Sequence, residues 1–513
     1  MFAHPKALAA VLTLGLLTTA CLNNQKPEPK PEPQPKQAAK PTPKKAARPA
    51  AKPAPKKPAK PAAKPAPKKT AAVPQIIGKT NKSALSYQPG EEMVFTFKMD
   101  FAKAKPGKYF LSYVRRGDDH KSFSGKVPAD QTMTVKTSLD RPGFVSVDVT
   151  LVDAKGKAVM LELPNGKKMQ RTVNYYAGTA VHPEKLADCG EPADFDAFWA
   201  RQKKRLAEVP FKGKVDRKLV KTVKNGNIYA VSIPAPGPRP ATGYLTIPNN
   251  AKPKSLPIVI HFSGYGTRVH TAPQTVANGQ ISFFLNAHGQ KLEQNAEYYK
   301  KFFASIRTPK YSYAFDPEQN KNPETCFFNG MVMRILRAME YLKTLPEWNG
   351  KTLIAQGGSQ GGLQTMWAAA LDPDVTVAKP SITWCCDLAG STKANRICGR
   401  WRIPYVPGLD YYDPVFMAKR IKKADVTIPK AGLGDYVCPP SGLMICYKNL
   451  ATPNKTIRWV QGSSHGFVPH RSEVIVWTTK KPAAKKPAAK KAPAVKKPAV
   501  KNPTVQQANP PMI

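Results

Sequence analysis

The stretch of residues 351–371 limits the possible folds of this chain more than any other part. It begins as an apolar run, passes through Gly-Gly-Ser-Gln-Gly-Gly, and continues as the alanine-rich run 363–371, which is typical of a helix. A serine on a strand-to-helix turn has a strained backbone, and Gly357 and Gly361 leave the space that such a turn needs. Gly-x-Ser-x-Gly alone is common in loops, but between a strand and a helix it indicates a nucleophile elbow. We therefore predict that Ser359 is a nucleophile.

A serine hydroxyl is a poor nucleophile at neutral pH, so it needs a base and a group that orients the base. Around such an elbow the partners follow in the order Ser, Asp or Glu, His, each in a loop after a strand. Asp435 and His465 fit this order and these loops, whereas His470 lies further beyond the last predicted strand. We predict a Ser-His-Asp triad with Asp435 and His465, and keep Asp425 and Asp387 as alternative carboxylates.

The tetrahedral intermediate of such a reaction needs two backbone N–H groups directed at its oxygen. One should come from Gln360, the residue after the nucleophile, and the other from the glycine-rich loop that follows residues 257–262. We assign the second donor to Tyr265, with Gly264 as the alternative. Three histidines are expected to be structural: His261, His270 and His288.

The catalytic residues lie in a region where strand and helix patterns alternate. Residues 257–262 are continuously apolar, as in the interior of a parallel sheet. Further strands are predicted at 228–233, 244–247, 377–384, 426–431 and 456–460, and helices at 192–199 (with Asp194 as its cap), around 331–342 and at 363–371. This alternation predicts a doubly wound α/β layer with the α/β-hydrolase fold over residues 181–479.

Residues 76–180 have a different pattern. Phe95, Phe97, Met99 and Phe101 alternate with polar residues, as in a half-buried strand. Similar short runs, separated by turn signals, occur at 110–114, 132–135, 145–151 and 159–161. We predict a small β-sandwich that serves as a packing or spacer module. A sugar-binding module is the alternative, although no row of exposed aromatic residues is evident.

Several of these segments together resemble a known family. In chain order they are 192–199, 263–266, 286–289, 357–362, 434–440 and 465–466. They look like the acetyl xylan esterase / cephalosporin C deacetylase family of α/β hydrolases, with a match over about residues 182–478, and the β-module resembles the extra N-terminal domain of some exported members. The resemblance implies Ser359 as nucleophile, Asp435 and His465 as its partners, and an oxyanion hole from the amides of Tyr265 and Gln360. It also implies removal of acetyl groups from sugars through an acyl-enzyme, without a metal; no cofactor is predicted.

The first 21 residues resemble a bacterial lipoprotein signal. Lys6 gives a positive start, residues 7–17 are apolar but too short to span a bilayer, and Cys21 follows as the candidate lipidated residue. Thr18 departs from the usual motif, which has leucine there, so ordinary signal cleavage before Cys21 is the alternative. Either way, we predict export to the cell envelope, with membrane attachment if Cys21 carries a lipid.

The chain of 513 residues has a net charge of +46, concentrated in part at its ends. Residues 22–76 contain 14 Lys and Arg against 2 acids, and residues 480–513 contain 9 Lys and no acid. The Lys/Pro/Ala-rich segments 22–75 and 480–513 are predicted to be disordered, the first as a tether. Because neither has an aromatic residue to stack on bases, a specific nucleic-acid partner is not expected. We expect the two segments to be solvated spacers or to bind anionic envelope polymers.

Seven cysteines follow Cys21, an odd number, and none has the spacing of a zinc site. We expect buried thiols and one or two disulfides.

These features predict an exported, lipid-anchored O-acetyl esterase acting on small acetylated saccharides. Two alternatives stay open: another serine hydrolase, such as a peptidase or a longer-chain esterase, and an envelope-binding protein with a residual hydrolase site. The oligomeric state is not predicted.

Overall fold

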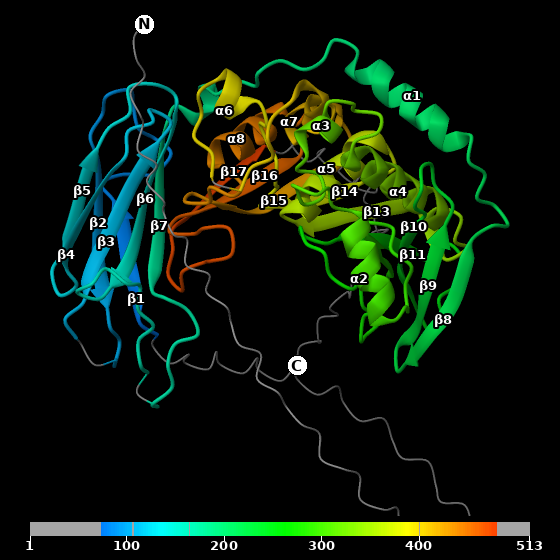
Figure 1. Ribbon diagram of the computed structural model, residues 1–513, viewed down its shortest axis with the longest axis horizontal. Coiled ribbons are helices and arrows are strands. Elements are labelled where there is room, and N and C mark those ends of the chain that lie inside the picture. The colour runs from blue at the N-terminus through cyan, green and yellow to red at the C-terminus, as the bar shows by residue number, and fades with distance from the viewer. Residues whose placement is uncertain (1–72, 105–106, 164, 400, 480–513) are drawn as a thin grey trace, which may run out of the picture. The chain divides into compact units, whose positions relative to one another are not determined.

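The computed structural model describes residues 73–104, 107–163, 165–399 and 401–479 (Figure 1). The predicted signal segment with Cys21, nearly all of the predicted tether, and the basic segment 480–513 lie outside the described residues. Within the described part, no helix combines the length and the apolar character that crossing a membrane requires.

The first seven strands form two antiparallel sheets around one apolar core (Figure 1). One sheet has the order β1-β2-β5 and the other the order β4-β3-β6-β7. The bounds are β1 Gln75–Thr80, β2 Met93–Asp100, β3 Phe110–Gly117, β4 Phe123–Pro128, β5 Met133–Thr137, β6 Gly143–Val152 and β7 Asn174–Val181. The alternation at Phe95 and Phe97 places both rings in this core, as a half-buried strand requires.

The prediction of a strand at 159–161 is wrong. After β6 the chain makes a tight turn, in which Gly156 N donates to Asp153 O, and it then pairs only through isolated bridges such as Val152 with Ala158. Strands β1, β4 and β7 were not predicted. Most side chains of β4 are exposed, so this strand has no apolar alternation to reveal it.

A second, ten-stranded sheet has the order β17-β16-β15-β14-β13-β11-β12-β10-β9-β8. Strands β11 to β16 are parallel to one another, while β8, β9, β10 and β17 pair antiparallel. The bounds are β8 Asp216–Val223, β9 Gly226–Ile233, β10 Ala241–Pro248, β11 Leu256–Phe262, β12 Ile281–Asn286, β13 Trp348–Gly358, β14 Val377–Ser381, β15 Asp425–Gly432, β16 Lys455–Val460 and β17 Val474–Thr479. Phe262 pairs with Gly357, so β11 and β13 end level with each other.

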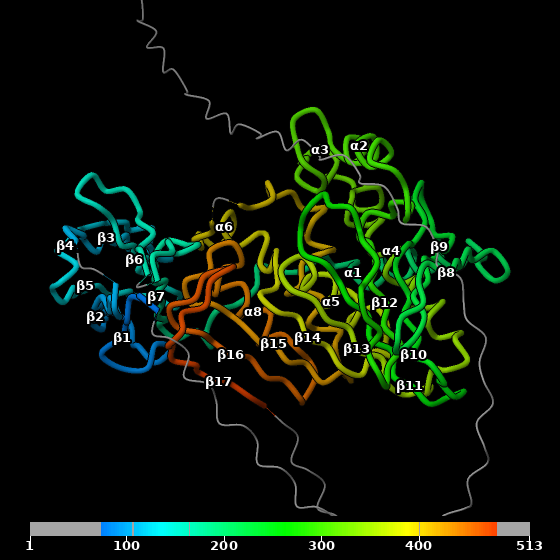
Figure 2. Tube along the Cα trace, turned by 90° about the horizontal axis from the view of Figure 1, so that it is seen from below, coloured from blue at the N-terminus to red at the C-terminus, as the bar shows by residue number. Residues whose placement is uncertain are grey.

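The helices that contact this sheet form one layer. Their bounds, with those of the other helices, are α1 Phe195–Ala207, α2 Ala296–Ser305, α3 Pro317–Asn320, α4 Phe327–Leu342, α5 Gln360–Leu371, α6 Gly390–Lys393, α7 Pro414–Met417 and α8 Pro440–Asn449. Helix α5 packs on β11, β13 and β14, α4 on β9 and β10, and α8 on β15, and these helices contact one another directly or through α7. Figure 2 shows α5 and α8 on the same side of the strands. Asp194 precedes α1 as predicted, but its carboxylate accepts from Tyr411 Oη rather than capping the helix.

A second, smaller apolar cluster lies on the opposite face of the sheet, at β9 and β10. Along β9, Val231 and Ile233 join the main core, whereas Ile228 points to the other side and packs with Tyr244 and Val276. A loop, not a helix, supplies Val276. The ten-stranded sheet and the helices packed on it form the predicted α/β fold.

The expected disulfides are absent from the described residues. The seven cysteines there are all free: Cys189, Cys326, Cys385, Cys386, Cys398, Cys438 and Cys446. Burial raises the thiol pKa of Cys385, Cys386 and Cys438 well above its usual value, so these thiols remain protonated.

Candidate active site

The turn between β13 and α5 carries Ser359. Its backbone has φ 58° and ψ −121°, a left-handed conformation that costs a non-glycine residue about 1–3 kcal/mol. A Cβ added at Gly361 would lie 2.4 Å from the carbonyl oxygen of Phe262, and one at Gly357 would lie 2.7 Å from the same oxygen. Because the end of β11 passes so close, glycine is needed at both positions. The serine itself is held by Ser359 N donating to Ser381 O at 2.9 Å.

His465 and Asp435 reach Ser359 from the loops after β16 and β15. His465 Nε2 lies 3.1 Å from Ser359 Oγ, and His465 Nδ1 lies 2.9 Å from Asp435 Oδ2. Since a carboxylate only accepts, Nδ1 carries the proton and Nε2 can accept the hydroxyl proton of Ser359. The structure thus brings together three residues from distant segments of the chain.

Asp435 is fully buried and fully hydrogen-bonded. Its Oδ1 accepts from the amides of Val437 and Cys438 at 3.0 Å each, and its Oδ2 faces His465. These bonds compensate the cost of burying the charge. The alternative carboxylates are engaged elsewhere: Asp387 pairs with Arg396, and Asp425 accepts from Asn454 Nδ2.

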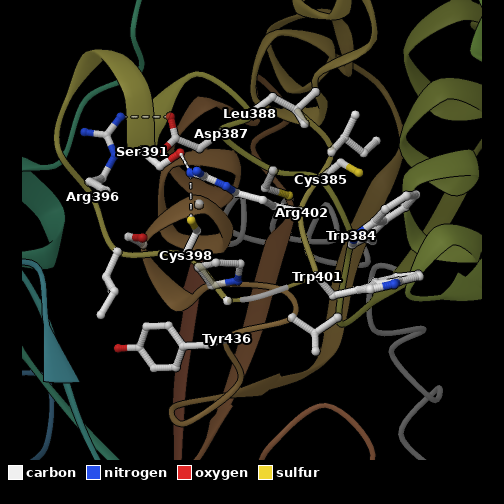
Figure 3. A pocket seen from close by; sticks show the side chains of 18 residues that line it. Trp384, Cys385, Asp387, Leu388, Ser391, Arg396, Cys398, Trp401, Arg402 and Tyr436 are labelled. Atoms are coloured by element: carbon white, nitrogen blue, oxygen red, sulfur yellow. Dashed lines mark hydrogen bonds and ion pairs between the residues drawn. The ribbon is translucent and has the colours of Figure 1, made fainter. Parts of the chain in front are cut away.

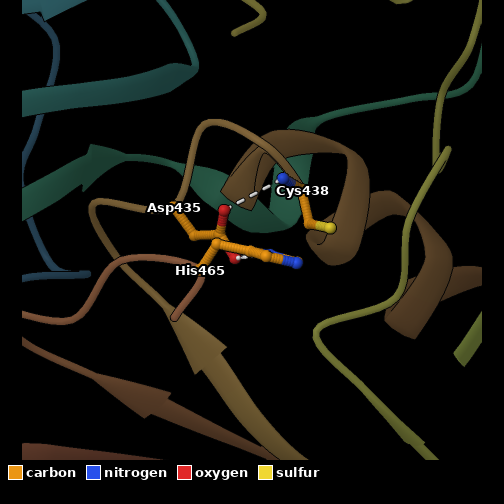
Figure 4. Close-up of side chains that lie close together, drawn as sticks. All are labelled: Asp435, Cys438 and His465. Carbon is orange, nitrogen blue, oxygen red and sulfur yellow. Dashed lines mark hydrogen bonds and ion pairs between the residues drawn. The ribbon is translucent and has the colours of Figure 1, made fainter. Parts of the chain in front are cut away.

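Cys438 lies beside this pair, and its sulfur, Asp435 and His465 could by distance alone hold a metal ion (Figure 4). The hydrogen bonds above, however, already use both Asp435 oxygens and His465 Nδ1. Burial and the neighbouring Asp435 raise the pKa of the Cys438 thiol, which disfavours the thiolate that a metal would need. The cluster is therefore accounted for as part of a hydrogen-bonded triad.

The two residues predicted to stabilise an oxyanion are Gln360, next to Ser359 in the chain, and Tyr265, whose loop is linked to Gln360. Gln360 is the first residue of α5, so its amide has no intrahelical partner. In the Tyr265 loop, Gly266 N donates to Tyr313 Oη at 3.0 Å, Tyr313 Oη donates to Gln360 Oε1 at 2.7 Å, and Tyr265 Oη donates to Tyr313 O. Tyr313, which the sequence did not reveal, therefore ties the Tyr265 loop to the start of α5.

Gln364 and His288 support the same loop. Gln364 Nε2 donates to Ser263 O at 3.1 Å, and His288 Nε2 donates to Gly266 O at 2.9 Å. His270 donates to Phe284 O, and His261 accepts from Gln356 Nε2. Burial lowers the pKa of all three histidines, His288 to about 4, so they are neutral at pH 7 and have structural contacts.

Aromatic rings surround Tyr265. It stacks on Tyr313 with centroids 4.2 Å apart, and it meets Trp384 and Trp401 edge to face at 5.3 and 4.6 Å. Trp401 is 37% exposed, whereas Trp384 is buried and its backbone N–H donates to Ser359 O. The strand predicted at 377–384 ends at Ser381, so Trp384 lies beyond it, and Trp401 also lies outside the strands and helices.

Trp384 and Trp401 also line a pocket of about 50 Å³ (Figure 3). Its other side is polar: Arg396 donates to Asp387, and Arg402 donates to Ser391 Oγ. Val437, which follows the Asp435 loop, completes the wall near the triad. Ser359, Asp435 and His465 are not among the residues that line it.

The chain is similar to several known proteins. Residues 185–396, a range that includes Ser359 and ends before Asp435 and His465, match the family described as acetyl xylan esterase (AXE1). The chain is similar to acetyl esterase Axe7A of Xylanibacter ruminicola, with 27% identity over 340 residues that cover 62% of this chain and 75% of the relative. It is also similar to the solved acetyl xylan esterase from Paenibacillus sp. R4 (22% identity, TM-score 0.47, covering 56% of this chain and 94% of that chain). A further similar structure is acetyl xylan esterase 1 from Thermoanaerobacterium sp. JW/SL YS485 (20% identity, TM-score 0.44, covering 56% and 93%).

Proposed function

We propose that this chain, a carboxylic-ester hydrolase of the acetyl xylan esterase family, removes O-acetyl groups from saccharides through an acyl-enzyme on Ser359. The observation that carries the proposal is the continuous hydrogen-bonded path from Asp435 through His465 to Ser359. A hydroxyl at the end of such a path can lose its proton as it attacks a carbonyl carbon.

In the first step, Ser359 Oγ bonds to the acetyl carbon and its proton passes to His465 Nε2. The amides of Tyr265 and Gln360 stabilise the negative oxygen of the tetrahedral intermediate. The sugar oxygen leaves with the proton from His465, and the acetyl group stays on Ser359. Water then attacks the acyl-enzyme, with His465 again as base, and releases acetate.

Replacement of Ser359 tests the proposal. Ser359→Ala should lower kcat on p-nitrophenyl acetate by about five to six orders of magnitude, because the nucleophile is lost. Ser391→Ala is a matched control, since Ser391 is a serine of the pocket wall that bonds to Arg402 and lies outside the triad. Substantial activity in a folded Ser359→Ala variant would exclude this serine as the nucleophile.

The acyl preference separates this function from a peptidase or a longer-chain esterase. The similarity to the acetyl xylan esterase family and to an acetyl esterase supports a short acyl group. We expect kcat/KM to fall steeply from acetyl through butyryl to octanoyl p-nitrophenyl esters, and peptide amides to be inert. A higher kcat/KM for octanoyl than for acetyl esters would support a longer-chain esterase instead.

Export and lipidation at Cys21 remain part of the proposal and rest on the sequence alone. Growth with an alkyne fatty acid should label the full-length protein and leave a Cys21→Ser variant unlabelled. Binding of anionic envelope polymer by the basic segment 480–513 can be checked by a pull-down on such polymer with and without that segment. Equal retention of both proteins would exclude this partner for the segment.

A further inference from the structure

The strand β7 of the β-sandwich contacts the two loops that carry Asp435 and His465. Tyr176 N donates to Gly462 O at 3.1 Å, as in a one-residue extension of the sheet. The side chain of Gln461, only 2% exposed, pairs with Gly178 in both directions: Gly178 N donates to Oε1 and Nε2 donates to Gly178 O, each at 2.8 Å. A buried side chain here takes the place of a neighbouring strand.

The backbones meet at very close range along this contact. A Cβ at Gly178 would lie 2.3 Å from the carbonyl oxygen of Leu433, and a Cβ at Gly434 would lie 2.5 Å from the carbonyl oxygen of Tyr176. Because main-chain atoms cannot move aside as a side chain can, β7 and the loop before Asp435 fit only with glycine at both positions.

The residues of this contact are close in the chain to Asp435 and His465. Gly434 directly precedes Asp435, and its N–H donates to Ser463 O, which lies two residues before His465. On the far side of His465, Arg171 of the β-sandwich donates to Gly466 O. The two loops are therefore joined to each other and to the β-sandwich.

Apolar packing supports the polar contact. Ala84, Leu85, Phe144 and Ala180 belong to the β-sandwich part of the sequence, yet they are buried in the same apolar cluster as the α/β layer. Phe144 contacts the ring of Trp459 on β16, with centroids 5.8 Å apart. A detachable spacer or a freely tethered sugar-binding module would not share a core with its neighbour.

We propose that the β-sandwich is a positioning part of the active site, and that Gln461 acts as a positioning residue by fixing the Asp435 and His465 loops against β7. The inference rests on the proposed function. Small displacements of a general base are costly, because catalysis depends on near-ideal distances between the reacting groups. Loss of the contact should therefore slow the chemical step more than it weakens substrate binding.

Two variants of the full chain test the inference, both assayed with p-nitrophenyl acetate. Gln461→Met keeps the side-chain volume and removes the bonds to Gly178, and Gly178→Ala forces the Leu433 carbonyl away from β7. We expect each to lower kcat about ten-fold or more, with KM within about two-fold. Because both act on one contact, the double variant should lose less than the product of the two effects.

Thr150→Val is the matched control. It removes a hydrogen bond to Asn174 inside the β-sandwich and none of the bonds between β7 and the triad loops. The control should lower the thermal midpoint and leave kcat unchanged. Wild-type kcat in folded Gln461→Met, or an equal loss of kcat in Thr150→Val, would overturn the inference. Activity retained by Ser359→Ala would instead refute the proposed function.

Discussion

Tyr313 is buried and makes hydrogen bonds to three residues at the candidate oxyanion hole. Its hydroxyl accepts from Gly266 N and donates to Gln360 Oε1, while its carbonyl accepts from Tyr265 Oη. An unmade bond at a buried polar group costs about 1–3 kcal/mol. This residue therefore determines how accurately the Tyr265 loop faces α5.

Tyr313→Phe should consequently lower kcat about ten-fold, since it leaves Gly266 N–H and the Gln360 side chain without their partner. Tyr265→Phe should cost less, about two- to three-fold, because the predicted oxyanion donor of Tyr265 is its main chain. Steady-state kinetics on p-nitrophenyl acetate measure both. A larger loss in Tyr265→Phe would show that its hydroxyl, rather than the amide, matters.

Trp401 is a partly exposed aromatic residue whose ring lies beside Tyr265. A pyranose ring can pack on a partly exposed aromatic ring, whereas p-nitrophenyl acetate has no sugar to place there. Trp401→Ala should raise KM for an acetylated xylo-oligosaccharide about five-fold, the equivalent of roughly 1 kcal/mol. KM for p-nitrophenyl acetate should not change. Equal effects on both substrates would point to a role of Trp401 in packing alone.

At the scale of elements, the elbow depends on the distance between β11 and α5. A Cβ at Gly361 would collide with the carbonyl of Phe262, which is itself fixed in the sheet. We expect Gly361→Ala to lower the free energy of unfolding by about 3 kcal/mol. Gly466→Ala is the control, because nothing lies within 4 Å of a Cβ there. Denaturant titration of both variants checks this; equal stability would contradict the close packing.

The strands with strong apolar patterns were predicted well, and the edge strands were not. A continuous apolar run predicted β11, because a strand buried on both faces is apolar throughout. Alternation of apolar and polar residues predicted β2, because only one face of that strand is buried. β8 is largely exposed, and its charged residues leave no such signature. β17 was missed although its sequence is apolar; it pairs only with β16 at the sheet edge, and its side chains are exposed or half-buried.

At the scale of the whole molecule, Asp148 makes stability depend on pH. Burial raises the pKa of this β6 carboxyl to about 6, against the opposing effect of Arg116, and its Oδ1 has no hydrogen-bond partner among the described residues. Between about pH 4 and 6 the native state then holds this proton more tightly than the unfolded chain does. The charged carboxylate therefore destabilises the fold above pH 6, and this penalty disappears as the pH falls below 4.

Asp148→Asn should raise the thermal midpoint by about 2 °C at pH 8 and leave it unchanged near pH 4. The exposed Asp140→Asn serves as the control and should have little effect at either pH. Thermal melts at the two pH values test whether the gain in thermal midpoint appears only at the higher pH. A gain at pH 4 that equals the gain at pH 8 would show that the effect does not come from the charge.

The sequence by itself determined the α/β fold class, the preceding β-rich region and the family resemblance, which the match over residues 185–396 confirms. It could do so because glycine spacing and apolar periodicity are local consequences of an elbow and of buried strands. The roles of Ser359, Asp435 and His465 stay predictions, now with a geometry that permits them.

Only the tertiary structure decided which distant groups meet. It placed Asp435, and not Asp387 or Asp425, against His465, left the described cysteines unpaired, and brought Gln461 onto β7. Such contacts join residues tens or hundreds of positions apart, and no local pattern encodes them. They follow from the order of strands in the sheet and from the close approach of backbones that glycine allows.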